Sequence, residues 1–305
     1  MKQLVILSGK GGTGKTSVAA AFAHLASAGT PALKAVLADA DVDAANLELV
    51  LHPHNLEVHA FTGGSVALID LERCQNCGRC QSVCRFDAII FNSDQYTVDP
   101  IACEGCAACM YQCPAEAIQM EPQEAGQWYR SESRYGSLFH AELYPAQENS
   151  GKLVTLVKQM ARLHAKESNS QMLIIDGPPG IGCPVIAAAA GADLALIVTE
   201  PTVAGVHDLK RIVETTRHFR IPTMVVINKA DIYPEGSSQI AAVCAELAID
   251  LAGRIPFDPL VTQAMLYGEP VTAYQPDAPS SRAIRDSWKL VVTRLVSTGG
   301  TDARS

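Results

Sequence analysis

Short apolar runs recur along the chain and alternate with longer segments of helical character. Each run is typical of a buried strand, and the runs fall at residues 4–7, 33–38, 172–175, 194–199, 223–227 and 251–255. The clearest helices are expected from the first glycine loop to about Ala28, over 150–166 and over 281–296. Strands that alternate with helices indicate crossover connections. The sequence therefore predicts an α/β fold with a mostly parallel sheet.

A cysteine-rich segment interrupts this alternation after the second strand. Residues from about 65 to 121 hold eight of the ten cysteines, in two similar half-motifs. We therefore expect two domains: a discontinuous sheet domain formed by residues 1–60 and 122–305, and an inserted α+β domain formed by residues 61–121. The ends of such an insert must lie close together on the surface of the host domain.

Charge and hydropathy narrow the class of protein. The chain has 305 residues and a net charge of −8, which argues against a nucleic-acid surface. Its apolar runs are too short to cross a bilayer, and the first run leads into a glycine loop rather than a signal-peptide cleavage site. The tail, 297–305, is expected to be frayed and has no apolar face, so we expect no membrane contact there.

These features predict a cytoplasmic protein. In that reducing compartment, ten cysteines indicate metal or redox sites rather than structural disulfides. Two parts of the chain stay open at this level. The polar segment 122–149 has no clear pattern, and Cys183 lies outside the cysteine-rich segment with no evident partner. Cys244 lies in an apolar helical stretch and is expected in the core.

A glycine-rich loop after the first strand predicts a phosphate-binding site. The stretch from Gly9 to Ser17 reads GKGGTGKTS, and it follows a strand and opens a helix, as a P-loop must. Its N–H groups and the helix N-terminus favour phosphate oxygens. Lys15 would reach the β- and γ-phosphates and Thr16 would hold Mg²⁺. The expected nucleotide ligands in this loop are Gly11, Gly12, Thr13, Gly14, Lys15, Thr16 and Ser17. The plain alternative is a glycine turn that opens a helix.

Two cysteine runs have the spacing of bacterial two-cluster ferredoxins. The runs are Cys74-x2-Cys77-x2-Cys80-x3-Cys84 and Cys103-x2-Cys106-x2-Cys109-x3-Cys113-Pro114, and Arg85 stands where the first run would have proline. In this type of protein the fourth cysteine of each run serves the other cluster. One [4Fe–4S] cluster is then expected on Cys74, Cys77, Cys80 and Cys113, and the second on Cys103, Cys106, Cys109 and Cys84. Zinc ribbons also use CxxC pairs, but they do not need two four-cysteine runs.

Together these motifs resemble those of the MinD/Mrp superfamily of P-loop ATPases, in a member that carries an inserted ferredoxin domain. This superfamily is related to the nitrogenase iron protein. Lys10 matches the extra lysine of the deviant Walker A motif. The resemblance implies a nucleotide-dependent homodimer in which Lys10 acts on the partner's ATP, as an arginine finger would. It also extends to the segment from Glu148 to Lys152 and to the stretch 199–202.

The same resemblance assigns two aspartates at strand ends. Asp41, in the sequence Asp39-Ala40-Asp41, is similar to the switch I residue that positions the attacking water. Asp176, which begins the sequence DGPPG, is similar to the Walker B carboxylate that holds a water of the Mg²⁺ shell. Gly177 and Gly180 would give switch II its backbone freedom. A plainer role for Asp39 or Asp43 is to cap the following helix.

The base pocket has two interpretations. Asn228, Pro256 and Asp258 are similar to the MinD pattern that holds adenine, and an Asn amide can both donate and accept. Asp231 completes an NKxD sequence, which keeps GTP as the alternative nucleotide. Asp231 could also simply cap a helix.

These motifs lead to three functional hypotheses. The leading one is a dimeric ATPase whose nucleotide state is coupled to two clusters that deliver electrons to a redox partner protein. The second is a carrier or assembly ATPase for iron–sulfur clusters, in which the cluster is cargo. The third is a positioning ATPase whose ferredoxin domain is only structural.

Overall fold

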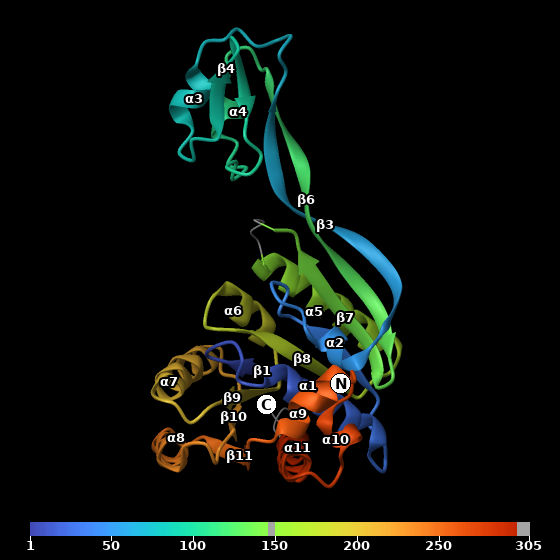
Figure 1. Cartoon of the computed structure of the whole chain (residues 1–305). Coiled ribbons are helices and arrows are strands. Elements are labelled where there is room, and N and C mark those ends of the chain that lie inside the picture. The colour runs from blue at the N-terminus through green and yellow to red at the C-terminus, as the bar shows by residue number, and fades with distance from the viewer. Residues whose placement is uncertain (146–149, 298–305) are drawn as a thin grey trace, which may run out of the picture. The chain divides into compact units, whose positions relative to one another are not determined.

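The computed structural model describes residues 1–145 and 150–297, and these divide into two compact units (Figure 1). The sheet unit comprises residues 1–58, 128–142 and 150–297. The cysteine unit comprises residues 59–127 and 143–145. The sequence predictions for Glu148, Asn149 and the tail beyond Ser297 lie outside the described residues.

One sheet of nine strands, counted over the described residues, runs in the order β11-β10-β9-β1-β8-β2-β7-β6-β3. The strands are β1 (Lys2–Ser8), β2 (Ala35–Asp39), β3 (His54–Ile69), β6 (Ile118–Ser133), β7 (Gly136–Leu143), β8 (Met172–Pro179), β9 (Leu194–Thr199), β10 (Thr223–Asn228) and β11 (Asp250–Ile255). β1 pairs in parallel with β8 on one side and with β9 on the other. The predicted α/β fold with a mostly parallel sheet is confirmed.

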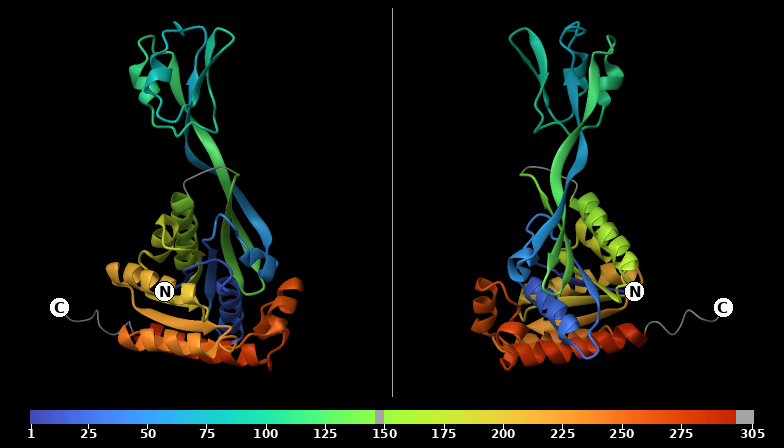
Figure 2. Two further views of the ribbon diagram at one scale, coloured as in Figure 1. Left: turned by 60° about the vertical axis from the view of Figure 1, so that its left-hand side comes forward. Right: turned by 90° about the vertical axis from the view of Figure 1, so that its right-hand side faces the viewer.

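Helices cover both faces of this sheet, as the views in Figures 1 and 2 show. One face carries α1 (Lys15–Ala28), α2 (Leu47–Leu51), α9 (Pro259–Leu266), α10 (Val271–Tyr274) and α11 (Pro279–Ser297). The other carries α5 (Ser150–Glu167), α6 (Cys183–Ala189), α7 (Val203–His218) and α8 (Pro234–Glu246). Because both faces are covered, the central strands contain continuous apolar runs, and these runs revealed them in the sequence.

The core between α1, α11 and the sheet is closely packed. Phe22 and Trp288 lie with their ring centroids 4.8 Å apart, and Leu37 and Ile174 pack into the same cluster. Burial of large apolar side chains is the main favourable contribution to folding, so this cluster stabilises the helix that follows the glycine loop. Cys244 is 3% exposed, as predicted for a core residue, and burial raises its pKa to about 11.

The unassigned segment 122–149 proves to contain two strands of the main sheet. β7 lies next to β2 in the sheet, where Leu37 of β2 pairs with Leu138 of β7. β6 lies between β7 and the edge strand β3. β6 is mostly half-exposed, with only scattered buried positions. A strand of that kind lacks both a continuous apolar run and a strict alternation, so the sequence pattern did not reveal it.

The cysteine unit repeats one simple arrangement. Each cysteine run contains a short helix, α3 (Arg79–Val83) in the first and α4 (Ala108–Gln112) in the second. β4 (Ile89–Asn92) and β5 (Gln95–Val98) form an antiparallel pair between the two runs. Ala67, Ile69, Ile89 and Ile118 build a small apolar core together with buried cysteines.

Within the described residues, no helix combines the length and the apolar character that crossing a membrane would require.

Candidate nucleotide-binding and iron–sulfur sites

The glycine loop lies between β1 and α1, at the carboxyl end of β1, which pairs with β8 and β9 inside the sheet. Gly12 and Gly14 have φ angles of +77° and +91°, in the left-handed region that favours glycine. A Cβ atom on Gly14 would lie 2.3 Å from Nδ2 of Asn228. That amide donates a 2.8 Å hydrogen bond to the carbonyl oxygen of Thr13. Asn228, predicted as a base ligand, therefore also fastens the loop.

Buried polar atoms without hydrogen-bond partners occur in and beside the glycine loop. Lys15 is 6% exposed, and the Thr13 hydroxyl and Asp176 Oδ1 are buried with no hydrogen-bond partner among the described residues. Burial raises the pKa of Asp176 to about 6, although Lys15 and a hydrogen bond from Thr16 oppose this. Such orphaned groups are costly unless a ligand satisfies them. The donor set of Thr16 and Asp176 suits Mg²⁺, a cation that prefers oxygen ligands.

The two aspartates at the end of β2 have different surroundings. Asp39 is fully buried and accepts hydrogen bonds from the backbone N–H groups of Asp41, Asn46 and Leu47, at 3.0, 3.1 and 2.9 Å. Leu47 begins α2 and Asn46 is its N-cap residue, so the Asp39 carboxylate satisfies N–H groups at the start of this helix without being its N-cap. Asp41 is half-buried; burial raises its pKa and the charge of Lys15 opposes the rise. Asp41 thus lies near the P-loop lysine, while Asp39 shapes the loop.

Switch II, the DGPPG sequence, comprises the last residues of β8 and Gly180, and its two glycines serve different purposes. Gly180 has a φ of +93°, and its N–H donates to the carbonyl oxygen of Ser8 at 2.9 Å. A Cβ atom on Gly177 would lie 2.8 Å from the carbonyl oxygen of Ile6. Backbone freedom therefore explains Gly180, whereas close strand packing explains Gly177.

A buried glutamate that sequence analysis did not single out faces the other side of the loop. Glu200 directly follows β9 and is 9% exposed. Its Oε2 lies 3.0 Å from Lys10 Nζ, and its Oε1 accepts a hydrogen bond from Lys229. A carboxylate at the carboxyl end of a parallel strand points to a ligand crevice. The reasoning that selected Asp41 could have selected Glu200 as well.

The expected base pocket is a cavity beside the loop, lined by Asn228, Pro256, Phe257 and Asp258 among others. Asp258 caps α9 through the Leu260 N–H at 3.0 Å and accepts from the Ser280 hydroxyl at 2.7 Å. If Asp258 binds the base as predicted, its carboxylate would have to do so while it accepts these two hydrogen bonds.

Asp231 is also occupied in this structure. Its Oδ1 accepts the backbone N–H of Phe257 at 2.6 Å, and the N-cap of α8 is Tyr233 instead. The simple helix-capping role for Asp231 is therefore wrong. A carboxylate that holds the backbone next to the cavity is less free to accept two N–H groups from guanine.

A polar network behind switch I joins four elements of the sheet unit. His140 on β7 is buried, with Nδ1 3.2 Å from Glu48 on α2 and Nε2 2.9 Å from the Ser131 hydroxyl on β6. Ser131 also donates to Asn55 on β3 at 2.7 Å. Burial lowers the pKa of His140 to about 4, so its ring is neutral at pH 7. The helix after switch I is thereby tied to the strands that continue into the cysteine unit.

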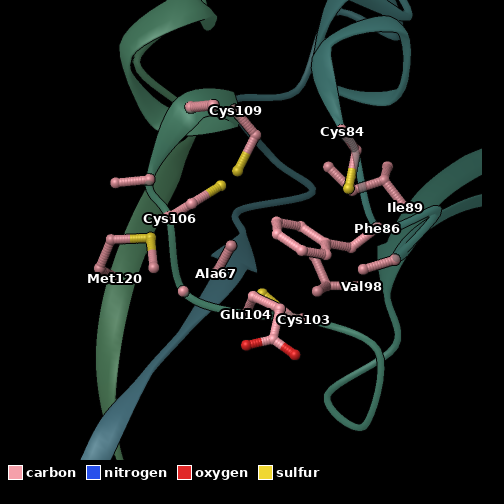
Figure 3. A pocket seen from close by; sticks show the side chains of 14 residues that line it. Ala67, Cys84, Phe86, Ile89, Val98, Cys103, Glu104, Cys106, Cys109 and Met120 are labelled. Atoms are coloured by element: carbon pink, nitrogen blue, oxygen red, sulfur yellow. The ribbon is translucent and has the colours of Figure 1, made fainter.

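The cysteines gather into two cavities of the cysteine unit. One cavity contains Cys84, Cys103, Cys106 and Cys109, as shown in Figure 3. The other contains Cys74, Cys77, Cys80 and Cys113. The structure thus brings together the same two sets of four that the spacing predicts, with the fourth cysteine of each run in the opposite set.

The surroundings of these cysteines fit iron–sulfur cubanes. The walls are largely apolar, with Ala67, Ile89, Val98 and Met120 in the cavity of Figure 3. Over the described part of the chain, no three His, Cys, Asp or Glu side chains converge as ligands of a single metal ion. A cubane does not need such convergence because each thiolate binds a different iron. The two sets of four cysteines in largely apolar cavities are compatible with two cubanes.

Cys183 belongs to the sheet unit and lines neither of these two cavities. It is exposed and begins α6, directly after switch II. A Cβ atom on Gly151 would lie 3.6 Å from its Cβ, so the start of α5 passes close by.

The nucleotide loop, the two switches and the sheet order together match a known family. The model of the CobQ/CobB/MinD/ParA nucleotide-binding domain matches residues 4–271. The chain belongs to this family. The cell division ATPase MinD of Pyrococcus furiosus shares the fold, with a TM-score of 0.57 over 96% of this chain and 98% of the other at 17% identity.

Two curated relatives are similar in sequence to parts of this chain. An uncharacterized protein of Methanocaldococcus jannaschii is 36% identical over 227 residues, which cover 74% of this chain and 78% of the relative. An iron–sulfur cluster carrier protein of Aquifex aeolicus is 30% identical over 138 residues, which cover 41% of this chain and 38% of the carrier. The likeness to the carrier is therefore limited to less than half of either chain.

Proposed function

We propose that this protein is an ATP-hydrolysing, nucleotide-switched homodimer whose cysteine unit holds two [4Fe–4S] clusters and passes electrons to a partner redox protein. The observation that carries the proposal is the grouping of eight cysteines into two complete sets of four, in the same chain as a P-loop. Such clusters supply one-electron chemistry when bound.

The residues around the loop divide the ATPase work between them. Under this proposal, the loop N–H groups and Lys15 hold the β- and γ-phosphates, and Thr16 and Asp176 hold Mg²⁺. Asp41 orients the attacking water, and Lys10 acts on the nucleotide of the second subunit. The unpaired buried oxygen of Asp176 and the half-buried position of Asp41 near Lys15 support these roles.

Coupling between the two units would begin at switch I. Asp39 fixes the start of α2, and Glu48 of α2 contacts His140, which is linked through Ser131 to Asn55. β3 and β6 then continue without interruption into the cysteine unit. Under this proposal, a change in switch I reaches strands that line the cluster sites through these contacts.

Cluster carriage is the second candidate, because the Aquifex aeolicus relative is named a cluster carrier. In that case the cluster would be cargo that leaves the protein. Cys80 and Cys109 are each 8% exposed, and four thiolates for each cluster leave no iron open for transfer. These features favour retained clusters over released ones.

The deciding experiment measures the clusters with and without nucleotide. Anaerobically reconstituted protein is reduced with dithionite, and its EPR spectrum and reduction potentials are recorded with and without MgATP and MgGTP. We expect MgATP to change both, and Thr16→Ala, which removes an Mg²⁺ ligand, to abolish the change. Identical spectra and potentials, or quantitative transfer of iron to an apo-ferredoxin, would contradict electron delivery.

A further inference from the structure

One buried carboxylate forms ion pairs with two lysines beside the glycine loop. Glu200 Oε2 lies 3.0 Å from Lys10 Nζ, and Lys229 donates to Oε1. The Glu200 side chain is 12% exposed, against 38% for Lys10 and 34% for Lys229. The Glu200 carboxylate is therefore largely shielded from solvent. The two lysine side chains are partly exposed, so each could exchange its partner.

The carboxylate of Glu200 is charged at neutral pH. Burial alone would raise its pKa, but hydrogen bonds and the charges of Lys229 and Lys10 outweigh this and lower it. An ionised carboxylate in a buried position needs a cation, and removal of its last partner is strongly destabilising.

The two lysines differ in what else they contact. Lys229 Nζ also lies 3.4 Å from the carbonyl oxygen of Gly12, within the glycine loop. Lys10 is held at its backbone, where its carbonyl oxygen accepts the Ser8 hydroxyl at 2.7 Å, and the ion pair with Glu200 orients its side chain. The Lys10 ammonium could therefore leave while Lys229 keeps Glu200 paired.

We propose that Glu200 holds the Lys10 side chain within its own subunit in the nucleotide-free state, and that Lys229 keeps Glu200 paired when Lys10 moves to the nucleotide of a second subunit. Glu200 is then a positioning residue that sets the protein concentration at which the nucleotide-bound chain dimerises. This inference rests on the nucleotide-dependent homodimer of the proposed function.

Two substitutions should shift dimerisation in opposite directions. Glu200→Gln keeps the shape but removes the charge that retains Lys10, so half-maximal dimerisation should need about 2- to 5-fold less protein, as expected for a partly exposed ion pair. Lys229→Gln leaves Lys10 as the only cation on Glu200, so dimerisation should need more protein. The measurement is sedimentation velocity of the full chain with a non-hydrolysable ATP analogue.

Controls separate this effect from general damage. Glu214→Gln changes an exposed carboxylate on α7 and should not shift dimerisation. Fluorescent ADP binding to each variant monomer corrects for any loss of nucleotide affinity at Lys229, which lines the base cavity. A second measurement reads the ion pair directly: the acylation rate of Lys10 in nucleotide-free protein, followed by mass spectrometry, should rise in Glu200→Gln.

The outcomes distinguish this inference from the proposed function. Wild-type protein that never dimerises with nucleotide would overturn the proposed homodimer. Wild-type protein that dimerises, with Lys10 acylation and dimerisation unchanged in Glu200→Gln, would overturn this inference alone. Dimerisation that becomes harder in Glu200→Gln would also overturn it, because Glu200 would then act in the dimer and not before it.

Discussion

The two cysteine runs share a backbone arrangement but differ in the side chains between their cysteines. In both runs the four cysteines are half-buried, exposed, buried and half-buried in turn. The corresponding positions carry Gln75 and Arg79 in the first run but Glu104 and Ala108 in the second. Each of these four residues lines the cavity of its own run.

This comparison teaches which properties the two sites can share. Enclosure and thiolate exposure are matched, so these factors should affect both clusters equally. The ligand loops differ by two charges, because Arg79 adds one positive and Glu104 one negative charge. Net charge is one of the factors that set cluster potential. Any functional difference between the sites should therefore follow these side chains.

The largest effect is expected when pairs of cysteines are replaced to test the crossed ligand sets. Cys84→Ser combined with Cys106→Ser removes two ligands of one set and should leave about half of the iron, because the other set stays complete. Cys84→Ser combined with Cys77→Ser damages both sets and should leave little iron. Iron analysis of anaerobically reconstituted protein measures both. Equal iron in the two double variants would contradict the crossed arrangement.

The next test uses a backbone difference between the runs. Gly105 has a φ of +64°, and a Cβ atom there would lie 2.2 Å from the carbonyl oxygen of Ser65. Its counterpart, Asn76, has a φ of +50° and donates a 3.0 Å hydrogen bond to the carbonyl oxygen of Asp94. Gly105→Ala should cost about 2–4 kcal/mol through backbone displacement, whereas Asn76→Ala should cost about 1 kcal/mol.

The two variants are compared by incubating each in urea and measuring how much cluster absorbance is lost over a fixed time. Equal losses of absorbance in Gly105→Ala and Asn76→Ala would contradict the close approach of Gly105 to the Ser65 carbonyl oxygen.

A smaller effect is expected from exchanging charge between the loops. Glu104→Gln should raise the reduction potential of the site of Figure 3, and Gln75→Glu should lower that of the other site. Because these side chains are exposed, each shift should be on the order of 10–40 mV and should shrink at high salt. EPR-monitored redox titration at two ionic strengths measures it. Shifts that persist at high salt would indicate a structural rather than an electrostatic cause.

The smallest effect concerns the residues that precede α3 and α4. Gly78 and Ala107 both have positive φ, at +73° and +60°. Ala107→Gly should stabilise the cysteine unit by about 1 kcal/mol, and Gly78→Ala should destabilise it by a similar amount. The same urea assay compares them. A stabilising Gly78→Ala would show that this position relaxes to negative φ.

Much of the sheet unit could be predicted because local sequence and tertiary position agree there. The run at 194–199 is apolar throughout, and β9 occupies the same residues with every side chain buried. The start of β3 and most of β6 could not be predicted, because their side chains are largely exposed or half-exposed and show no continuous apolar pattern.

Prediction of the candidate sites succeeded where spacing alone decides geometry. The cysteine sets follow from tight loops, so the structure groups them as expected. The Glu200–Lys10 and Glu48–His140 contacts join residues far apart in the chain, and no local spacing signals these contacts. The occupied carboxylate of Asp258 likewise depends on Ser280, which lies 22 residues further along the chain.

The length of β3 and β6, 16 residues each, has a consequence for how this protein can evolve. Side chains alternate along a strand, so one inserted or deleted residue turns every later side chain to the opposite face unless a bulge absorbs it. Ala67 and Ile69 near the end of β3, and Ile118 and Met120 at the start of β6, line the two cysteine cavities. Homologous chains should therefore lengthen or shorten these strands in steps of two residues, and in both strands together.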